Sequence, residues 1–495
     1  MKRVLAFLLA CLMILPSLVA CGGEKKAAGG ANIVIENEDS ADTPDLPTVE
    51  EIGDISGEFY VLVAGNWEWN DFEAEADSTN VVESAIYKRN QYILDKYDVE
   101  IVNEDIVKYS SAMGSGDGYK KLYNNYMAGD HIYDAAMIGT YDIANLALNG
   151  ILYDLNDVEH IDLGKSYWDQ KANADLSMNG KMYYTTGDIS VADNRATYVL
   201  FFSKSMIDMY GLESPYDLVR DNEWTLEKFG EMVKTVGTDN NNDGIYGKED
   251  TFGLLTPTDT HLAILAAADE RIATINDEGK LELTFYNERV VNLYDAYLNI
   301  ASDHSHSYNY QYNYATGKTG LTSTNEERVS MFNNNQGLFY SHTMFYMDHL
   351  RDIENDFGII PYPKYDASQD SYGNLVSAWH AQFLCVPDTA TPEVFSRTGI
   401  ILEELAYMGD VVLTPAYYEK TLHGQYVRDE ESSEMLDIIF ANLVYDMGIY
   451  YNVGTYKEKL TSIVRTGQTI TTLYEENRSA ALAKVDEINN KFFEN

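Results

Sequence analysis

The sequence predicts an α/β protein built around parallel sheet, on three observations. Short runs of strand-forming residues, such as 59–64 and 134–138, alternate with segments of helical spacing, such as 81–97. Strands that alternate with helices in this way form parallel βαβ units. A chain of 495 residues is too long for one domain of ordinary size, so we expect two lobes. From Pro392 onward the pattern is almost wholly helical, which predicts a helical C-terminal region.

The N-terminus has the layout of an export signal. A positive start, Lys2 and Arg3, precedes an uncharged apolar run at 4–15, and the run closes at Leu-Val-Ala-Cys, 18–21. The apolar run is shorter than the roughly 20 residues that span a bilayer. Leu-Val-Ala-Cys resembles the lipobox of bacterial lipoproteins, so we expect removal of residues 1–20 and a lipid on Cys21. An ordinary signal peptide with a chance cysteine is the alternative.

Charge and cysteine content restrict the partners. A formal net charge of -44 repels nucleic-acid phosphates and anionic lipid heads, so we expect no nucleic-acid binding and membrane attachment through the lipid anchor only. The ligand is expected to be neutral or cationic. Of three cysteines, Cys11 leaves with the signal and Cys21 carries the lipid, so the mature chain has no intrachain disulfide. Cys385 lies in an apolar run and is expected to be buried.

The elements follow an acidic, proline-containing tether that we place at residues 21–56. The first strand, 59–64, is rich in strand formers and ends at Gly65. Thr225 can cap the helix that begins at 226. The remaining strands are predicted at 99–102, 134–138, 182–185, 198–202, 337–340, 357–361 and 382–386, with a hairpin at 276–279. Helices are predicted at 81–97, 119–127, 143–148, 204–210, 226–236, 288–301 and 326–334.

A polar run at 303–324 carries tyrosines at alternate positions: Tyr308, Tyr310, Tyr312 and Tyr314. In a strand, all four rings would share one face. Such a face could contact a sugar. Packing of a long loop against its own domain is the more ordinary explanation.

One segment has the spacing of a calcium loop. Oxygen ligands at positions 1, 3, 5 and 12, a carbonyl at position 7 and a glycine at position 6 define such loops. The matching residues are Asp239, Asn241, Asp243, Asp250, the carbonyl of Ile245, and Gly244. Asp stands at position 12 where Glu is usual. We expect a structural calcium ion, and a solvated Asn/Asp turn is the alternative.

Catalytic signatures are absent from the sequence. It has no G-x-S-x-G elbow, no phosphate loop, no H-E-x-x-H, no C-x-x-C and no G-x-G-x-x-G after a strand. Carboxylate pairs occur by chance in so acidic a chain. We therefore expect a binding protein and not an enzyme, with a secreted glycan hydrolase as a weaker alternative.

Aromatic residues are abundant, with 39 Tyr, 17 Phe and 5 Trp. Six lie at the ends of predicted strands or in the loops that leave them: Trp67, Trp69, Tyr141, Phe345, Tyr346 and Trp379. Open α/β sheets bind ligands at the carboxyl ends of their strands. A flat ring suits the apolar C–H face of a sugar, and Asp, Asn, Arg or His suit its hydroxyls. For each ring, ordinary packing is an equal alternative.

The order of several short motifs resembles the extracellular solute-binding proteins of ABC importers, in particular the family 1, sugar-type lipoproteins. After the lipobox these are YDAAMI at 133–138, NGILYDL at 149–155, NGKMY at 179–183, LFFSK at 200–204, WTLEKF at 224–229 and FGIIPYP at 357–363. The resemblance covers about 57–412. It implies a two-lobed periplasmic-binding-protein-like fold of type II style, with the ligand in a cleft between the lobes.

The resemblance also implies boundaries and contacts. Lobe 1 would comprise 57–188 plus 361–415, and lobe 2 would comprise 189–360 plus 416–495. The chain would cross between lobes near 188–195 and return near 360–365. The implied ligand contacts are Trp67, Trp69, Tyr141, Asp188, Arg195, His342, Phe345 and Trp379.

The expected function is that of a monomeric, lipid-anchored receptor on the extracellular face of a bacterial cell membrane. It would capture a carbohydrate, with an oligosaccharide as the expected ligand, and deliver it to the permease of an ABC transporter. A binder of another solute, such as a peptide, is the alternative.

Overall fold

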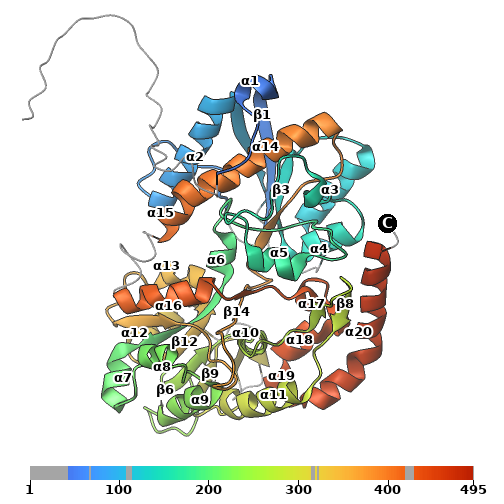
Figure 1. Cartoon of the computed structure of the whole chain (residues 1–495). Coiled ribbons are helices and arrows are strands. Elements are labelled where there is room, and N and C mark those ends of the chain that lie inside the picture. The colour runs from blue at the N-terminus through green and yellow to red at the C-terminus, as the bar shows by residue number, and fades with distance from the viewer. Residues whose placement is uncertain are drawn as a thin grey trace, which may run out of the picture. The chain divides into compact units, whose positions relative to one another are not determined.

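The first sheet has four strands in the order β15-β3-β1-β2 (Figure 1). The computed structural model describes residues 43–493 except 66–68, 107–113, 314–317, 320–322 and 419–428. The strands are β1 (Gly57–Ala64), β2 (Val99–Asp105), β3 (Ala135–Gly139) and β15 (Gln382–Cys385). β1 pairs in parallel with β2 and β3, and β15 is antiparallel to β3. The predicted parallel units are therefore confirmed in this sheet.

Helices from two parts of the chain cover the first sheet: α2 (Val81–Tyr97), α3 (Asp117–Ala128), α4 (Thr140–Leu148) and α14 (Pro392–Met408). α2 packs against β2 and α14, whereas α3 and α4 contact each other and β3. Figure 1 shows α14 lying across β1 and β3. α2 ends at Asp98, whose φ of 55° is left-handed, so the chain turns directly into β2. The thiol of Cys385 is buried in this sheet as expected, and burial raises its pKa.

The second sheet is mixed, with the order β13-β4-β12-β6-β5 and β9 paired to β6. Its strands are β4 (Tyr198–Ser203), β5 (Gly237–Thr238), β6 (Thr251–Thr256), β9 (Ser307–Asn309), β12 (Gly337–Thr343) and β13 (Phe357–Ile360). β12 and β13 run antiparallel to β4, while β6 is parallel to β12 and β9. All described residues belong to one compact unit.

Short strand pairs and many helices complete the described chain. The pairs join β7 (Ala273–Ile275) to β8 (Leu281–Leu283), β10 (Tyr312–Asn313) to β11 (Lys318–Thr319), and β14 (Asn374–Leu375) to β16 (Leu443–Val444). The other α-helices are α1 (Val49–Ile52), α5 (Gln170–Leu176), α6 (Ala192–Ala196), α7 (Lys204–Tyr210), α8 (Pro215–Arg220), α9 (Leu226–Thr235), α10 (Thr260–Ala267), α11 (Glu288–Ala301), α12 (Asn325–Asn333), α13 (Met347–Leu350), α15 (Thr414–Tyr418), α16 (Glu430–Phe440), α17 (Met447–Tyr450), α18 (Tyr456–Thr461), α19 (Ile463–Thr466) and α20 (Ile470–Phe493). Short 3-10 helices lie at η1 (Leu155–Asp157), η2 (Met344–Tyr346) and η5 (Val453–Thr455), and a π-helical turn at η3 (Gly409–Leu413).

Two segments connect the sheets. Residues 188–197, which include α6, lead from the first sheet into β4. After β13 the chain remains against residues 219–226, since the Trp224 indole donates to the carbonyl of Pro361 at 2.9 Å. It lies against the first connection at Val376, which bridges Thr197, and at Ser377, whose N–H donates to the carbonyl of Ala196. The expected return at 360–365 and the lobe boundaries stay predictions.

Most predicted elements are confirmed, and two differ for tertiary reasons. Residues 182–185 form no continuous strand, because among them only Thr185 makes a backbone bridge, an isolated one to Leu384. Residues 140–142, which lie between the predicted strand 134–138 and the helix predicted from 143, are already the start of α4, where the Thr140 N–H donates to the carbonyl of Ala381. Sequence periodicity does not report either contact.

The tyrosine run does not form one exposed face. Tyr308 and Tyr310 are buried, and the Arg328 guanidinium lies 4.3 Å from the centre of the Tyr310 ring. β9 ends at Asn309, so the alternation does not continue along one strand. Tyr314 lies outside the described residues. Packing against the domain is thus the correct explanation for the two buried rings.

The predicted signal and Cys21 also lie outside the described residues. Within the described ranges, no helix combines the length and apolar character needed to cross a membrane. The tether predicted at 21–56 contains, in its described part, the single turn α1, which Thr48 and Glu51 close as a capping box.

Candidate functional site

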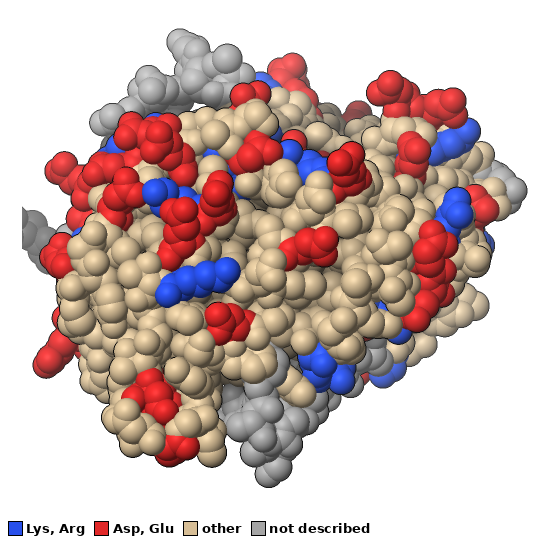
Figure 2. All heavy atoms as spheres, turned by 90° about the horizontal axis from the view of Figure 1, so that it is seen from below, with Lys and Arg blue, Asp and Glu red and all other residues tan. Residues whose placement is uncertain are grey.

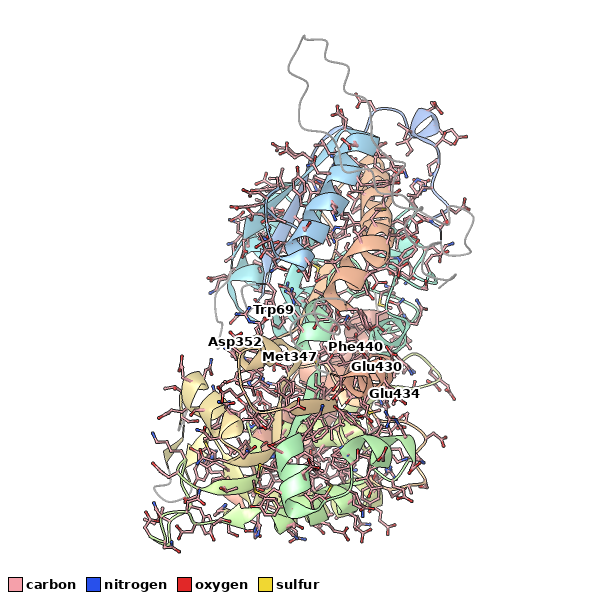
Figure 3. The ribbon with its side chains drawn as sticks, turned by 90° about the vertical axis from the view of Figure 1, so that its left-hand side faces the viewer. Trp69, Met347, Asp352, Glu430, Glu434 and Phe440 are labelled. Carbon is pink, nitrogen blue, oxygen red and sulfur yellow. The ribbon has the colours of Figure 1, made fainter. Side chains whose placement is uncertain are left out.

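Four ring side chains from both sheets meet in one place, and we call them the aromatic cluster: Trp69, His342, Phe345 and His380. The Trp69 and Phe345 centroids are 5.6 Å apart in an edge arrangement. His380 lies 5.1 Å from Phe345 and 6.3 Å from Trp69, and His342 lies 5.4 Å from Phe345. In Figure 3 Trp69 lies just above Met347, which follows Phe345 by two residues. The cluster therefore joins the loop after β1 to the end of β12.

Backbone and polar contacts hold the aromatic cluster. The Gln382 amide donates to the carbonyl of Trp69 at 2.8 Å, which ties the loop after β1 to β15. His342 stacks on Tyr346 with centroids 4.0 Å apart. The His380 Nδ1 lies 3.0 Å from the Ser377 hydroxyl. Because β12 passes directly into η2, Phe345 and Tyr346 are fixed at the carboxyl end of a central strand.

The two histidines of the aromatic cluster are neutral at physiological pH. Burial lowers the pKa of His380 to about 3 and that of His342 well below its ordinary value. A neutral imidazole offers one donor and one acceptor. The cluster thus presents aromatic faces and uncharged hydrogen-bonding groups.

Arg195 lies at the edge of the aromatic cluster. Its guanidinium carbon is 6.0 Å from the centre of the Trp69 ring, and Nη1 is 3.7 Å from an oxygen of Asp71. Asp71 is 2% exposed and accepts from the Ser190 hydroxyl and the Val191 N–H. It therefore ties the first connection to the loop after β1. Sequence reasoning missed Asp71, although it lies two residues beyond Trp69.

Tyr141 and Trp379 form a second aromatic pair, with centroids 6.5 Å apart. The Lys457 ammonium donates to the Tyr141 hydroxyl at 2.9 Å and lies 4.2 Å from the ring centre. The Tyr198 hydroxyl donates to Asp259 at 3.2 Å. Burial raises the pKa of Asp259 and lowers that of Lys457, while the Lys457 charge partly opposes the rise at Asp259.

Asp259 and Lys457 were also missed from the sequence. Asp259 follows the carboxyl end of β6 at the start of α10, so the strand-end rule could have found it. Lys457 comes from the C-terminal helices, and nothing local marks it. These residues place an ammonium and a carboxylate group beside the Tyr141 and Trp379 rings.

Asp188, also implied as a ligand contact, lies in a cavity and not in the aromatic cluster. It accepts from the Thr414 hydroxyl at 2.5 Å and lines a cavity of about 350 Å³ with Asp169 and Asp193, which we call the carboxylate cavity. Burial raises the pKa of Asp188 to about 7 and, with repulsion from Asp169, that of Asp193 to about 8. Of the eight implied contacts, Trp69, Arg195, His342 and Phe345 meet, Tyr141 and Trp379 pair, and Trp67 lies outside the described residues.

The predicted calcium loop lies between β5 and β6, with Asp239, Asn241, Asp243 and Ile245 followed by the buried Asp250. The Gly244 N–H donates to Asp239 Oδ2 at 2.8 Å, and the Ile245 N–H donates to Asp243 at 2.7 Å. Asp250 accepts from the N–H groups of Asn240 and Gly247. Asp239 Oδ1 is buried without a hydrogen-bond partner. In the described ranges no group of three or more His, Cys, Asp or Glu side chains gathers closely enough to hold a metal.

No protein-family model matches the chain, and no curated protein matches it in sequence. Solved structures match its fold over most of its length. An ABC substrate-binding protein of Listeria monocytogenes in complex with cycloalternan is 13% identical with a TM-score of 0.52, covering 88% of this chain and 98% of that one. The maltodextrin-binding domain MalE of Bdellovibrio bacteriovorus bound to maltotriose is 11% identical with a TM-score of 0.54, covering 87% and 100%.

The chain has the fold of ABC-transporter substrate-binding proteins. The predicted fold class is confirmed in that respect. UgpB of Mycobacterium tuberculosis in complex with glycerophosphocholine also matches, with 14% identity, a TM-score of 0.54 and coverage of 88% and 99%. These three structures hold cycloalternan, maltotriose and glycerophosphocholine, so the fold alone does not identify the ligand of this chain.

Proposed function

We propose that this protein is an extracellular receptor that captures a carbohydrate between its two sheets and delivers it to the permease of an ABC importer. The observation that carries the proposal is the aromatic cluster. It combines Trp69 from the loop after β1 with Phe345 from the end of β12, 5.6 Å apart. A ligand that contacts both sheets favours the arrangement in which they approach, and this differential contact is what closure requires.

The chemistry of the site favours a neutral, hydroxyl-rich ligand. The rings match apolar C–H faces, and the neutral histidines, Arg195, Asp71 and Lys457 can bond hydroxyls. Figure 2 shows the surface charges of one face, where Asp and Glu side chains are spread with Lys and Arg among them. The neighbours in complex with cycloalternan and maltotriose support an oligosaccharide. A peptide is the alternative that the test below must separate.

We also propose that the protein binds its ligand without making or breaking a bond in it. The matching structures are binding proteins, which supports a receptor over a hydrolase. A thermal-shift screen of the chain from residue 22, against mono- and oligosaccharides and peptides, tests the ligand class. A ligand at about a hundred times its Kd should stabilise the protein by about 2.7 kcal/mol. The sugar should be recovered unchanged. A response to peptides alone would reject the carbohydrate assignment, and cleavage of the sugar would reject the receptor.

Attachment through a lipid on Cys21 is supported by the Leu-Val-Ala-Cys sequence at the end of the apolar run. One saturated chain gives only marginal membrane binding, so stable anchoring needs the two or more chains of a lipoprotein. Cys21→Ala should release folded protein into the medium. Retention of that variant in the membrane fraction would contradict the anchor.

A structural calcium ion in the 239–250 loop is a separate proposal. The donor set of carboxylate, amide and carbonyl oxygens suits calcium. Asp239 Oδ1 supports the fit, because it is buried without a hydrogen-bond partner while Oδ2 is held by the loop backbone. Asp239, Asn241, Asp243, the carbonyl of Ile245 and Asp250 would hold the ion. It would stabilise the turn between β5 and β6 and take no part in ligand capture.

A further inference from the structure

Asp259 stands between β6 and α10, and its carboxylate does not cap the helix that follows. Its backbone already has helical angles, with φ of -72° and ψ of -16°. A capping side chain reaches the first N–H groups of a helix from an extended backbone, so the carboxylate of Asp259 projects away from them. It accepts instead from the Tyr198 hydroxyl at 3.2 Å.

The loop that carries Asp259 is anchored on both sides of this residue. The Thr258 N–H and hydroxyl donate to Gln311 Oε1 at 2.6 Å and 2.7 Å. The Thr260 hydroxyl lies 2.7 Å from the hydroxyl of Ser341 in β12. The position of Asp259 is therefore fixed by the protein before any ligand arrives.

One oxygen of the Asp259 carboxylate remains available to a ligand. Oδ2 accepts from Tyr198. Within the described part of the chain, Oδ1 accepts no hydrogen bond, and it is not one of the partnerless polar atoms that are closed to water. The residue as a whole is half-buried. A carboxylate has about four acceptor positions, so Oδ1 can accept from a donor that arrives from solvent.

The ammonium of Lys457, in α18, is close enough to Asp259 for the two charges to act on each other. Burial raises the pKa of Asp259, and the Lys457 charge opposes the rise. Burial lowers the pKa of Lys457, and the charges of Glu458 and Asp259 oppose the fall. The ammonium donates to the Tyr141 hydroxyl at 2.9 Å and lies 3.7 Å from a Glu458 oxygen. Opposite charges thus lie near each other while each keeps a different direct partner.

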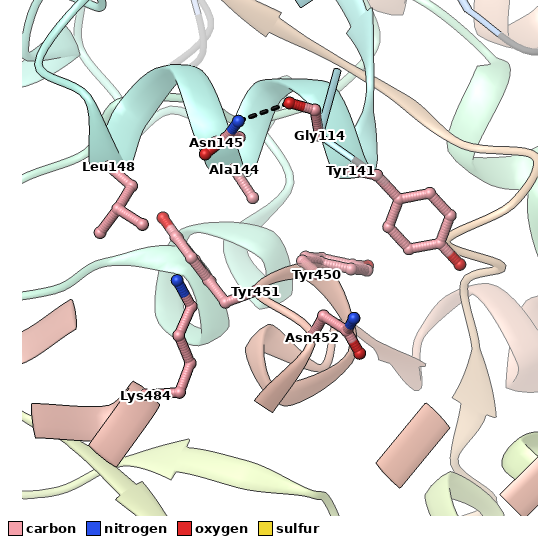
Figure 4. A pocket seen from close by; sticks show the side chains of 9 residues that line it. All are labelled: Gly114, Tyr141, Ala144, Asn145, Leu148, Tyr450, Tyr451, Asn452 and Lys484. Atoms are coloured by element: carbon pink, nitrogen blue, oxygen red, sulfur yellow. Dashed lines mark hydrogen bonds between the residues drawn. The ribbon is translucent and has the colours of Figure 1, made fainter. Parts of the chain in front are cut away.

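An aromatic ring that a ligand can reach lies beside these charges. The Lys457 ammonium is 4.2 Å from the centre of the Tyr141 ring, and the Trp379 centroid is 6.5 Å from that of Tyr141. Figure 4 shows the Tyr141 ring at the start of α4, with its hydroxyl pointing away from the helix. Tyr141 is only 8% exposed, whereas Trp379 is half-buried. Trp379 is therefore the ring of this pair that offers surface to a ligand.

A short chain of polar contacts joins Asp259 to the aromatic cluster. Burial and the Asp259 charge raise the pKa of Tyr198, and a hydrogen bond with Ser377 partly opposes the rise. The Ser377 hydroxyl in turn lies 3.0 Å from Nδ1 of His380, a member of the aromatic cluster. Asp259 is thus a near neighbour of the cluster, so adjacent units of one oligosaccharide can contact both.

The opposite charges restrict the charge of the ligand. A ligand ammonium would be attracted by Asp259 and repelled by Lys457, and a ligand carboxylate would meet the reverse. Repulsion between like charges is weakly screened where they are partly buried. An uncharged hydroxyl donates to Oδ1 without such repulsion, and a hydrogen bond to a carboxylate is about twice as strong as one between neutral groups.

We propose that Asp259 is a specificity-determining ligand contact, whose Oδ1 accepts from a hydroxyl of one sugar unit beside Trp379 while neighbouring units contact the aromatic cluster. Asp259 and Lys457 together then exclude amino sugars and uronic acids. This inference rests on the proposed function and deepens it, because it restricts the ligand to uncharged oligosaccharides and names the residue that selects them.

The test uses variants of the full mature chain and matched sugars. Asp259→Asn keeps the shape of the side chain and removes its charge, and Tyr198→Phe removes the hydroxyl that holds Oδ2. Asp208→Asn, on the exposed side of α7, is the control for the loss of one negative charge. Calorimetry at pH 6 measures Kd for five probes. They are maltotriose, cellotriose, the trimer of N-acetylglucosamine, the cationic trimer of glucosamine and the anionic trimer of galacturonic acid.

Wild type should bind the best neutral trimer at least about tenfold more tightly than either charged trimer. Asp259→Asn should weaken binding of that neutral trimer about tenfold. Tyr198→Phe should weaken it about threefold, and the double variant should bind no more weakly than Asp259→Asn alone, because the hydroxyl acts through Asp259. Asp208→Asn should leave every Kd unchanged.

Two further readouts separate a ligand contact from a structural role. Asp259→Asn should bind the galacturonic acid trimer better relative to the neutral trimer than wild type does, since the repelling carboxylate is gone. A general loss of stability would leave this ratio unchanged. A Tm of Asp259→Asn at or above that of wild type excludes a folding defect.

Three outcomes overturn the proposal. If a neutral trimer binds, Trp69→Ala weakens it and Asp259→Asn leaves its Kd unchanged, the receptor function stands and Asp259 is not a ligand contact. Equal affinity of wild type for the glucosamine and N-acetylglucosamine trimers would show that the charges do not select the ligand. If wild type binds none of the neutral sugars, the carbohydrate function itself fails, and the role of Asp259 fails with it.

Discussion

The aromatic cluster and the carboxylate cavity both lie where the two sheets are connected, yet they are built from opposite chemistry. In the aromatic cluster, burial keeps His380 neutral by lowering its pKa to about 3. In the carboxylate cavity, burial favours the protonated acid by raising the pKa of Asp188 to about 7 and that of Asp193 to about 8. Burial therefore opposes charge at both sites in a chain with a formal charge of -44. The net charge describes the surface, and desolvation decides the interior.

The largest expected effect is on stability and comes from a substitution in the carboxylate cavity. The pKa of Asp193 is about 8 in the folded protein and about 3.9 in the unfolded chain. The protonated Asp193 therefore contributes to the free energy of unfolding in full below about pH 4, and this contribution is lost as the pH rises to 8. The free energy of unfolding of Asp193→Asn, relative to that of the wild type, should therefore rise by about 3 kcal/mol between pH 5 and pH 8. The Asn amide can keep the contacts with the Asn194 N–H and the Tyr445 hydroxyl.

Denaturant unfolding of both proteins at several pH values measures this difference. Asp295→Asn, on the exposed side of α11, is the control and should show no such gain. Parallel stability curves for wild type and Asp193→Asn would show that Asp193 ionises freely in the folded protein. Ligand affinity should not change in Asp193→Asn, because the aromatic cluster does not include this residue.

The second largest expected effect is on sugar binding and comes from a substitution in the aromatic cluster. Trp69→Ala removes the ring that faces Phe345 and the Arg195 guanidinium. Loss of one aromatic face should weaken sugar binding about tenfold to a hundredfold. Calorimetry with the best sugar measures Kd, and Tyr123→Ala, which removes an exposed ring from α3, serves as control. Equal weakening by both variants would point to a general loss of stability and remove Trp69 from the site.

A smaller effect concerns the 239–250 loop, which belongs to neither the aromatic cluster nor the carboxylate cavity. Calcium at about 10 mM should raise the Tm by about 1–3 °C if the loop binds with the weak affinity of extracellular modules. Asp239→Asn should abolish the rise. Asp277→Asn, in the exposed hairpin turn between β7 and β8, should keep it. A wild-type Tm that ignores calcium would leave the loop as a solvated Asn/Asp turn.

The smallest expected effect is the pH dependence of sugar binding at the aromatic cluster. Burial lowers the pKa of His380 to about 3 and that of His342 well below its ordinary value, so the Kd for the sugar should change less than about twofold between pH 6 and pH 8. Titration calorimetry at the two pH values provides the measurement. A tenfold loss of affinity at pH 6 would show that a histidine of the aromatic cluster gains a proton in the free protein.

The fold was predictable from local pattern wherever the pattern was strong. α7 and α11 begin and end where the periodicity places them, because their apolar residues recur at helical spacing and Asn287 caps α11. Residues 182–185 look like a strand locally, but their neighbours leave them only one isolated bridge. A strand needs a partner along its length, and the sequence does not show whether one is available.

The site was predictable only in part, for a similar reason. Trp69, Phe345 and Tyr141 follow predicted strands, so the rule that ligands bind at strand ends selects them. His380 and Lys457 reach the same region from the connection and the C-terminal helices, where no local rule applies. Asp188, by contrast, was implied as a contact and lies in the carboxylate cavity with Asp193.

The sequence by itself determined the α/β class, most helices, the strong negative charge and the export signal as a prediction, because these follow from composition and from periodicities a few residues long. Only the tertiary structure decided that Trp69 meets Phe345 and that Asp193 retains its proton near neutral pH. Each of these depends on residues far apart in the chain and on how completely they are removed from water. Burial is a property of the packed chain, so no local pattern contains it.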